Sequence, residues 1–399
     1  MANETVERST IHYLYFWMSG LSSLFVWNCM LSLSDYFEDR FSPEATRIYP
    51  FFFNVGGFMS FFLYDRIRAH IEFKRVSIVF PIFLVSVFIL IYLIGEYGGP
   101  RSGFKFNILL ALIFLSGFIN NIFQVSKIQY SFKFTYLEIT YFNTGTGLAG
   151  IIANLIALTN ASLLEQTAFA TKGLVYLVFQ VLIIGTILFI FGKYFATNPP
   201  EISDQEAVDA STEVDSMKGS IAAADEPLAN PSIADTFGRI LPCYCNMTLT
   251  FAISLGLHPA INFALGLGMQ NISMQIQIIL LIFNLGDSIG KYSYGVFPLK
   301  DGWTPYIISM SRFMFVVIAI WIFMPEGEYT TMSGKPLLSV PFNFLLALSN
   351  GFMTSALFSL SSERVPNSHK KNSGFLMTQG LLLGVSYGAL CVLLGTQYV

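Results

Sequence analysis

Charged residues are scarce in this chain. Asp, Glu, Lys and Arg make up 12% of its 399 residues, whereas an average soluble domain has roughly 25%. The formal net charge is only −3, so the chain lacks the basic excess of a protein that binds nucleic acid. So low a charge content argues against an ordinary soluble domain.

Metal-binding and catalytic motifs are also missing. The four histidines are scattered, and the four cysteines lack the paired spacing of a metal site. The sequence contains neither the HExxH pattern of zinc enzymes nor the serine nucleophile elbow of hydrolases. We therefore expect no metal and no cofactor. We interpret the cysteines as small core residues: Cys29, Cys243, Cys245 and Cys391.

Long apolar runs are what the chain has in place of charge. Hydrophobic residues make up 54% of it, and phenylalanine alone contributes 40 residues. The runs are continuous over about 20 residues, which fits membrane-spanning helices and not the short alternating strands of a β-barrel. We therefore predict an all-α polytopic membrane protein with eleven transmembrane helices. These are expected near residues 11–34, 46–64, 75–95, 106–127, 137–159, 173–195, 237–264, 274–297, 303–324, 338–360 and 373–396.

One long polar segment, residues 196–235, interrupts the apolar runs. Its body is acidic, contains Pro and Ser, and has no aromatic residue, which is typical of a disordered linker. The segment divides the chain into three predicted parts. These are an N-terminal six-helix bundle over residues 1–195, a cytoplasmic linker over 196–235, and a C-terminal five-helix bundle over 236–399.

The basic loops predict the orientation in the membrane. Loop 65–75 carries four Lys or Arg residues and loop 361–372 carries three, and eleven spans place both loops on one side. Basic loops mark the cytoplasmic side of a membrane protein. We therefore expect the N-terminus and the linker in the cytoplasm and the C-terminus outside, with the plasma membrane as the location.

Two charges lie near the middle of the predicted eighth span, in the stretch FNLGDSIGK (283–291). One charge at the centre of a membrane helix costs about 2.5–3.5 kcal/mol, so two need a partner or a use. Asp287 and Lys291 are four residues apart and share a helix face with Asn284. They are either an ion pair that stabilises helix packing or a polar face that lines a water-filled cavity. We favour the cavity, because nothing within the helix itself requires a charge.

Other spans carry further candidates for ligand contact. Gln124 in the fourth span is either an interhelical hydrogen-bonding residue or a ligand contact. Trp27 lies too deep in the first span for an interfacial aromatic belt, and Leu24 and Leu31 share its helix face, which favours a cavity or core position. His258 precedes a proline in the seventh span. It is either part of a gate or proton-linked site, or a neutral histidine satisfied by a neighbouring helix.

Six motifs occur in the order in which one known family has them. They are GLSSLFVWNCMLSLSDYF, TGTGLAGIIA, LTFAISLGLHPAI, FNLGDSIGK, SRF and LSNGFMTSAL, in the first, fifth, seventh, eighth, ninth and tenth predicted spans. By these motifs the chain resembles the equilibrative nucleoside transporter family over nearly its whole length. The resemblance implies an eleven-span fold similar to the major facilitator class, in which two helical bundles rock around a central site.

The resemblance also implies roles for single residues. Gln124 matches the family's glutamine that hydrogen-bonds the base, and Asp287 and Lys291 match the acid and base that engage the ribose hydroxyls. The wall around the ligand in the first span is matched by Leu24, Trp27 and Leu31.

Two positions depart from the family pattern. Lys291 stands where the family usually has arginine, and lysine lacks the planar fork with which arginine reads two hydroxyls at once. His258 stands where an aromatic residue, usually phenylalanine, precedes the proline. We include His258 among the substrate-binding candidates, and the two departures leave nucleobase transport and proton coupling open.

The sequence thus predicts a facilitative carrier of nucleosides, with purine nucleosides among them and nucleobases as a further class. We expect a monomer in the lipid bilayer with no catalytic activity. A proton-coupled symporter, in which Asp287 or His258 binds the proton, is the alternative. An intramembrane aspartyl protease is a remote one, since it would need a second membrane aspartate beside Asp287 and the other acidic residues near spans lie at or near their ends.

Overall fold

A computed structural model describes residues 9–67, 73–163, 169–197, 232–265, 272–299, 303–323 and 335–395. Every regular element within these ranges is a helix, as the apolar runs predict. The greater part of the expected linker, residues 198–231, lies outside the described ranges. Its disorder therefore stays a prediction.

The helices before the linker begin close to the predicted spans. They are α1 (Thr10–Ser32), α2 (Ser34–Arg40), α3 (Ala45–Ile67), α4 (Phe73–Tyr97), α5 (Gly103–Ser131), α6 (Tyr136–Leu163) and α7 (Phe169–Thr197). After the linker follow α9 (Ile233–Leu265), α10 (Ile272–Val296), α11 (Thr304–Ser311), α12 (Phe313–Phe323), α13 (Lys335–Glu363), the 3₁₀ turn η2 (Asn367–His369) and α14 (Lys370–Gly395).

Two of the expected spans are interrupted. The first, 11–34, ends as a helix at Ser32, and Leu33 with φ −100° and ψ 20° joins α1 to the short α2. The ninth, 303–324, is broken at Arg312, which separates α11 from α12. Both breaks lie inside apolar runs, and hydropathy alone does not detect a local turn there.

Nine helical stretches in the described part are long and apolar enough to cross a bilayer. They lie in α1, α4, α5, α6, α7, α9, α13, α14 and the α11–α12 pair. The apolar part of α3, Ile48–Tyr64, is shorter. The helix α10, which contains both Asp287 and Lys291, is not among the nine. The total of eleven spans stays a prediction.

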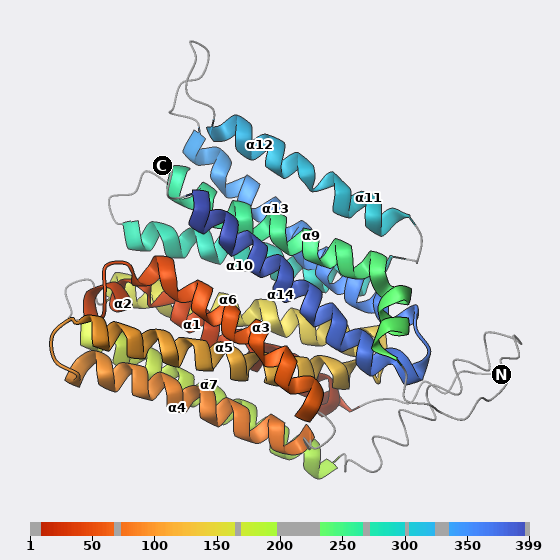
Figure 1. The fold of residues 1–399 in the computed structure, drawn as a ribbon, viewed down its shortest axis with the longest axis horizontal. Helices are drawn as coiled ribbons and strands as arrows, with labels where there is room; N and C mark the ends of the chain where they lie inside the picture. Colours follow the sequence, from red (N-terminus) through yellow and green to blue (C-terminus); the bar gives the residue numbers. More distant parts are fainter. Residues whose placement is uncertain are drawn as a thin grey trace, which may run out of the picture.

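The helices form two groups, and the axes of the long helices run roughly parallel or antiparallel to one another. In Figure 1, α1–α7 lie in the lower part of the molecule and α9–α14 in the upper part. The tightest pairs within the groups are α1 with α6, α3 with α5, α10 with α13, and α9 with α14. The two groups meet where α6 packs against α10 and where α14 packs against α3 and α5.

Glycines permit the closest of these contacts. A Cβ atom on Gly351 of α13 would lie 1.9 Å from the carbonyl oxygen of Asp287 on α10, and one on Gly290 of α10 would lie 2.1 Å from the carbonyl oxygen of Leu348. Because real Cβ atoms do not approach so near, α10 and α13 can pack backbone to backbone only with glycine at both positions. This packing fixes the helix that carries the two central charges.

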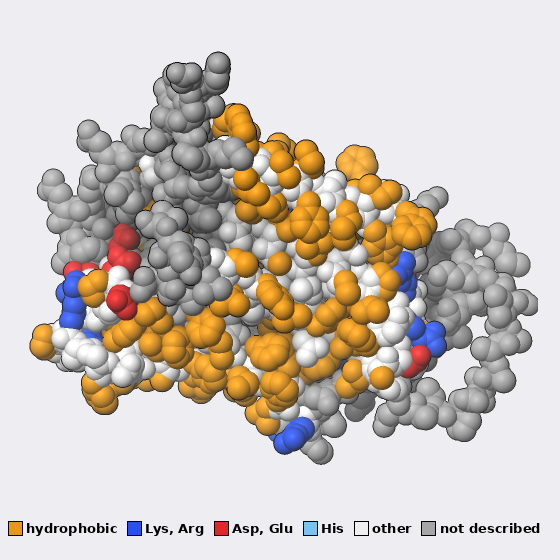
Figure 2. Space-filling view, turned by 45° about the horizontal axis from the view of Figure 1, so that its top comes forward, with side chains coloured by type: hydrophobic (Ala, Val, Ile, Leu, Met, Phe, Trp, Pro, Cys, Tyr) orange, Lys and Arg blue, Asp and Glu red, His pale blue; other side chains and the backbone are white. Residues whose placement is uncertain are grey.

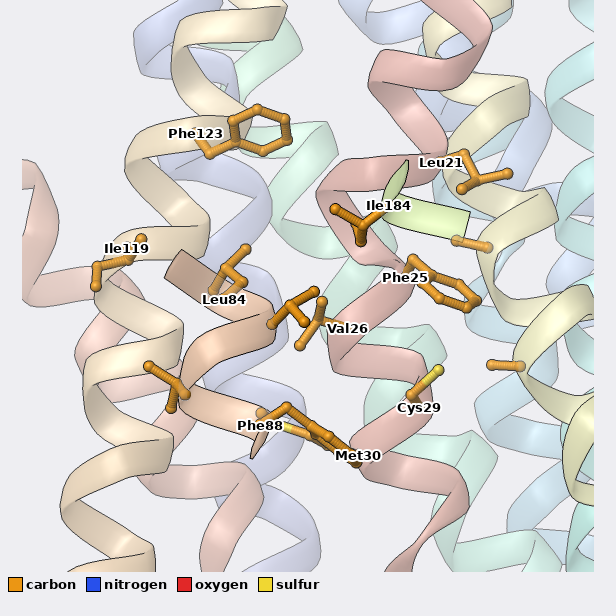
Figure 3. Packing of buried hydrophobic residues seen from close by; sticks show 14 of the residues in the cluster. Leu21, Phe25, Val26, Cys29, Met30, Leu84, Phe88, Ile119, Phe123 and Ile184 are labelled. Atoms are coloured by element: carbon orange, nitrogen blue, oxygen red, sulfur yellow. The ribbon is translucent and has the colours of Figure 1, made fainter. Parts of the chain in front are cut away.

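The interior of the first group is built on one face of α1. Figure 3 shows Val26 and Met30 of α1 beside Leu84 and Phe88 of α4, while Phe25 of α1 points away from them. All five side chains are at least nine-tenths buried. The opposite face of α1, which holds Leu24, Trp27 and Leu31, is only partly buried.

The outer surface is largely apolar. Figure 2 shows hydrophobic side chains along the length of the molecule, with most of the visible charged side chains toward its two ends. Large aromatic residues are among the exposed ones, for example Phe62 at 66% and Phe189 at 65%. An apolar band with charged ends is the surface that a bilayer requires.

One expectation about the cysteines is wrong. Cys29 and Cys243 are buried core residues, but Cys245 and Cys391 are exposed. In a membrane protein the outside of a helix is as apolar as its inside, so a small apolar residue in a span does not reveal which side it faces.

Candidate functional site

Asp287 and Lys291 form a buried ion pair on α10. The lysine Nζ lies 2.5 Å from the aspartate Oδ2, and the two residues are 6% and 5% exposed. Their spacing of four residues places them one helical turn apart on the same face, so the helix itself brings the charges together. Inside a bilayer, where water does not solvate a charge, the two opposite charges compensate each other.

Each member of the pair has a second partner on a different helix. Asn350 of α13 donates its amide hydrogen to Asp287 Oδ1 at 2.8 Å, so both carboxylate oxygens are engaged. Lys291 donates to the Thr146 hydroxyl of α6 at 2.8 Å. The aspartate is thus held within the second group of helices, while the lysine reaches across to the first group.

The same face of α10 carries more polar contacts toward α6. The Asn284 amide donates to Asn154 Oδ1 at 2.7 Å, and the Asn154 amide donates to Gln277 Oε1 at 2.8 Å. Gln277, Asn284 and Lys291 are spaced seven residues apart, which is two helical turns. They form a polar stripe that we call the α10 seam, and every residue of the seam bonds to α6.

Gln124 lies on α5 with its amide unengaged. The residue is 6% exposed, and among the residues that the structure describes no hydrogen bond to its side chain is formed. A primary amide can donate two hydrogens and accept at its oxygen. The side chain is therefore available to a ligand, although no direct bond links it to Asp287 or Lys291.

Trp27 lies on the partly buried face of α1. Its ring stacks on Phe53 of α3, with ring centroids 4.0 Å apart and planes inclined by 24°. Leu24 and Leu31 pack beside it against the same core cluster. An aromatic plate flanked by two aliphatic side chains is the kind of wall that receives a flat ring.

His258 belongs to a different cluster from the ion pair. Its Nδ1 lies 2.9 Å from Asn343 Oδ1, and its ring is 4.0 Å from that of Phe283. The Asn343 amide nitrogen donates to the Ser339 carbonyl oxygen, so its oxygen faces the imidazole and Nδ1 carries a hydrogen. The imidazole is thus bonded to the neighbouring helix α13.

The structure thus brings Asp287 and Lys291 into direct contact but does not connect Gln124, Trp27 or His258 to them. Sequence reasoning did not pick out Asn350 and Thr146, the partners of the pair. Both lie inside motifs that were recognised, LSNGFMTSAL and TGTGLAGIIA. Polar side chains within spans were the available signal. In the described ranges there is no group of three or more His, Cys, Asp or Glu residues that could hold a metal ion.

Comparison with known proteins identifies the family. The model of the family described as nucleoside transporter matches residues 110–394. The chain belongs to the nucleoside transporter family. The chain is 24% identical to equilibrative nucleoside transporter 2 of Rattus norvegicus, over 98% of this chain and 98% of that one. It is 22% identical to equilibrative nucleotide transporter 1 of Arabidopsis thaliana, over 94% of this chain and 84% of that one.

Solved structures of two other transporters share the fold of this nucleoside transporter family member. The human organic anion transporter MFSD10 superposes with a TM-score of 0.62 at 12% identity, over 97% of this chain and 94% of that chain. A bacterial homologue of the iron transporter ferroportin gives 0.61 at 13% identity, over 97% and 92%. The resemblance stated from the motifs is confirmed. The chain is an integral membrane transporter with a major-facilitator-like fold, and it is not an enzyme.

Proposed function

We propose that this transporter is a facilitative carrier of nucleosides that works by alternating access. The buried Asp287–Lys291 pair carries the proposal, because it is a charged, hydrogen-bonding group at a place where the bilayer makes charge costly. The names of its relatives, which are nucleoside and nucleotide transporters, support the substrate class. Purine nucleosides are the substrates we expect first, with nucleobases as a further class.

The chemistry of the pair suits the sugar of a nucleoside. A carboxylate accepts hydrogen bonds from two neighbouring hydroxyls, and an ammonium group donates to hydroxyl oxygens. Charge-assisted bonds of this kind are about twice as strong as neutral ones. In this proposal Asp287 and Lys291 bind the ribose hydroxyls. Without a ligand the two side chains bond to each other, and the hydroxyls of a bound ligand replace that contact.

The remaining candidate residues suit the base. Gln124 offers both donors and an acceptor for the edge of a purine. Leu24, Trp27 and Leu31 offer an apolar wall along which a flat ring can lie. His258, bonded to Asn343 and stacked near Phe283, is proposed as a further part of the wall.

The α10 seam provides a means of alternating access. It joins the two groups of helices through single hydrogen bonds, namely Lys291 to Thr146, Asn284 to Asn154 and Asn154 to Gln277. Such bonds are worth about 0.5–1.5 kcal/mol each, or more when one partner is charged, so rocking can break and re-form them. We propose that helices before and after the linker move as two bodies, six spans against five, around a midplane site. In the same proposal the N-terminus is cytoplasmic, and the carrier acts as a monomer in the plasma membrane.

Uptake measurements test the proposal. Labelled adenosine and labelled adenine are supplied separately to cells that lack their own purine carriers, at external pH values of about 6 and about 7.5. Saturable adenosine uptake that is indifferent to pH and to a protonophore is the expected result. Excess unlabelled inosine should compete, while hypoxanthine and uridine report the range of the site. A carrier that takes adenine and not adenosine would refute binding of the ribose.

Proton-coupled symport is the second candidate. A buried carboxylate and a buried imidazole, those of Asp287 and His258, are the groups that could bind the proton. Adenosine uptake that rises at acidic pH and collapses with a protonophore would establish this candidate in place of the facilitator.

A further inference from the structure

Arg312 is a buried cation at the break between α11 and α12. It is 1% exposed and is the largest of the fully buried side chains in the described part of the chain. Its guanidinium donates to the hydroxyl oxygens of Ser254 and Ser349, and to the carbonyl oxygens of Thr250 and Leu346 at 3.3 and 3.4 Å. No carboxylate of the described residues lies within ion-pair distance of it. A charge held in this way needs a reason, since neutral partners compensate it only in part.

Two residues connect Arg312 to the carboxylate of Asp287. The Ser254 hydroxyl, which accepts from Arg312, lies 2.8 Å from Asn350 Oδ1 and can donate to it. The amide nitrogen of Asn350 donates to Asp287 Oδ1 at 2.8 Å. Ser254, Asn350 and Arg312 are respectively 0%, 3% and 1% exposed, so water does not compete for these bonds. We call Arg312, Ser254 and Asn350 the relay.

The two ends of the relay set the direction of the bonds that they make, while the Ser254 hydroxyl has two acceptors for its one hydrogen, Asn350 Oδ1 at 2.8 Å and the Thr250 carbonyl oxygen at 2.9 Å. A guanidinium can only donate and an ionised carboxylate can only accept. The Asn350 amide must therefore turn its nitrogen to Asp287 and its oxygen to Ser254. When the Ser254 hydrogen points to Asn350, the dipoles of the middle groups align from the cation to the anion, and bonds aligned in this way reinforce one another. The relay thus fixes Oδ1 as the Asp287 oxygen that accepts from Asn350.

We propose that Arg312, Ser254 and Asn350 are positioning residues that hold the Asp287 carboxylate in the orientation that recognises ribose hydroxyls. The proposal rests on the proposed function, in which Asp287 binds the sugar. The relay holds Oδ1, which leaves Oδ2 to Lys291 or to the ligand. The relay also keeps the positive charge of Arg312 linked to Asp287 when Lys291 turns from the carboxylate to the substrate.

The two serines bonded to Arg312 provide a matched pair of variants. Both Ser254 and Ser349 accept from the guanidinium, but only Ser254 continues to Asn350. Ser254→Ala therefore cuts the relay, while Ser349→Ala removes an equivalent bond on the other side of the same cation. Arg312→Lys keeps a donor and the charge, whereas Arg312→Gln removes the charge.

The readout is discrimination between two competitors of labelled adenosine uptake. Unlabelled adenosine is compared with its 2′,3′-dideoxy analogue, which lacks the two neighbouring ring hydroxyls of the ribose, and the ratio of their inhibition constants is measured at matched surface levels. We expect the wild type to favour adenosine by about tenfold or more, which corresponds to about 1.4 kcal/mol. Ser254→Ala and Asn350→Ala should bring the ratio close to one, mainly through weaker adenosine binding. Ser349→Ala should retain it.

The possible outcomes separate the two proposals. If the wild type does not discriminate, the assignment of the sugar to Asp287 fails with the proposed function. If the wild type discriminates and Ser254→Ala and Asn350→Ala still do so, the relay has no positioning role and this inference is overturned. A variant that loses uptake of all substrates equally, with an unchanged ratio, also contradicts it. Partial recovery of the ratio in Arg312→Lys relative to Arg312→Gln would support the part played by the buried charge.

Discussion

The variant Asp287→Asn tests how much of the ion pair serves stability and how much serves transport. It leaves Lys291 as a buried charge whose remaining partner is the Thr146 hydroxyl at 2.8 Å. Removing one partner of a buried pair costs about 3–5 kcal/mol, and the Thr146 bond favours the lower end of this range. At about 3 kcal/mol, the thermal midpoint of a unit of 150–250 residues would fall by roughly 6–12 °C. We expect the variant to reach the membrane, to melt at a lower temperature and to transport almost nothing.

The double variant Asp287→Asn/Lys291→Gln separates the two roles. It removes both charges and leaves two amides four residues apart, which can bond to each other along the helix. Exchange of a whole buried pair for neutral groups is often close to neutral for stability, so most of the lost thermal midpoint should return. Uptake should not return, because neither the carboxylate nor the ammonium group is present to bind ribose.

Three measurements on the same variants decide the matter. They are labelled adenosine uptake, the amount of protein at the cell surface, and the thermal midpoint of the purified carrier in detergent. A double variant that is stable, reaches the surface and transports like the wild type would refute the reasoning. The pair would then serve helix packing alone.

Other predictions follow from single contacts. Gln124→Ala should raise the KM for adenosine about tenfold through the loss of one or two hydrogen bonds to the ligand. The thermal midpoint should not change, because the amide has no hydrogen-bond partner among the described residues. A lower midpoint with an unchanged KM would make Gln124 structural. Gly147→Ala should slow uptake at a normal surface level, because its Cβ would lie 2.2 Å from a serine hydroxyl oxygen on α10 and hold the two groups of helices apart. The control is Gly185→Ala, where no atom lies within 4 Å, and equal uptake by both variants would contradict the close approach. His258→Gln, which can still donate to Asn343 but has no ring to place beside Phe283, should raise the KM for adenosine and leave the pH profile of uptake unchanged. The loss of an acid-stimulated component would instead identify His258 as the proton site.

Much of the architecture could be predicted from local properties of the chain. A bilayer admits few backbone structures, so continuous apolar runs indicate helices wherever they occur, and most of the helices lie close to the expected ranges. The ion pair was also predictable, because Asp287 and Lys291 are neighbours on any α-helix whatever surrounds it. The breaks at Leu33 and Arg312 could not be predicted in this way, since hydropathy measures transfer to lipid and not backbone direction.

The class of protein, the apolar helices and the face of α10 that carries the charges follow from local stretches of the chain, because each of these depends on residues within a few turns of one another. Which side chains complete the site depends on the packing of helices that are distant in the sequence. Asn350 lies 63 residues from Asp287 along the chain, Ser254 lies 96 from Asn350, and Thr146 lies 145 from Lys291. Contacts over such separations depend on how α6, α9, α10 and α13 pack, and the glycines that allow that packing act through backbone distance, which no local pattern of the sequence encodes.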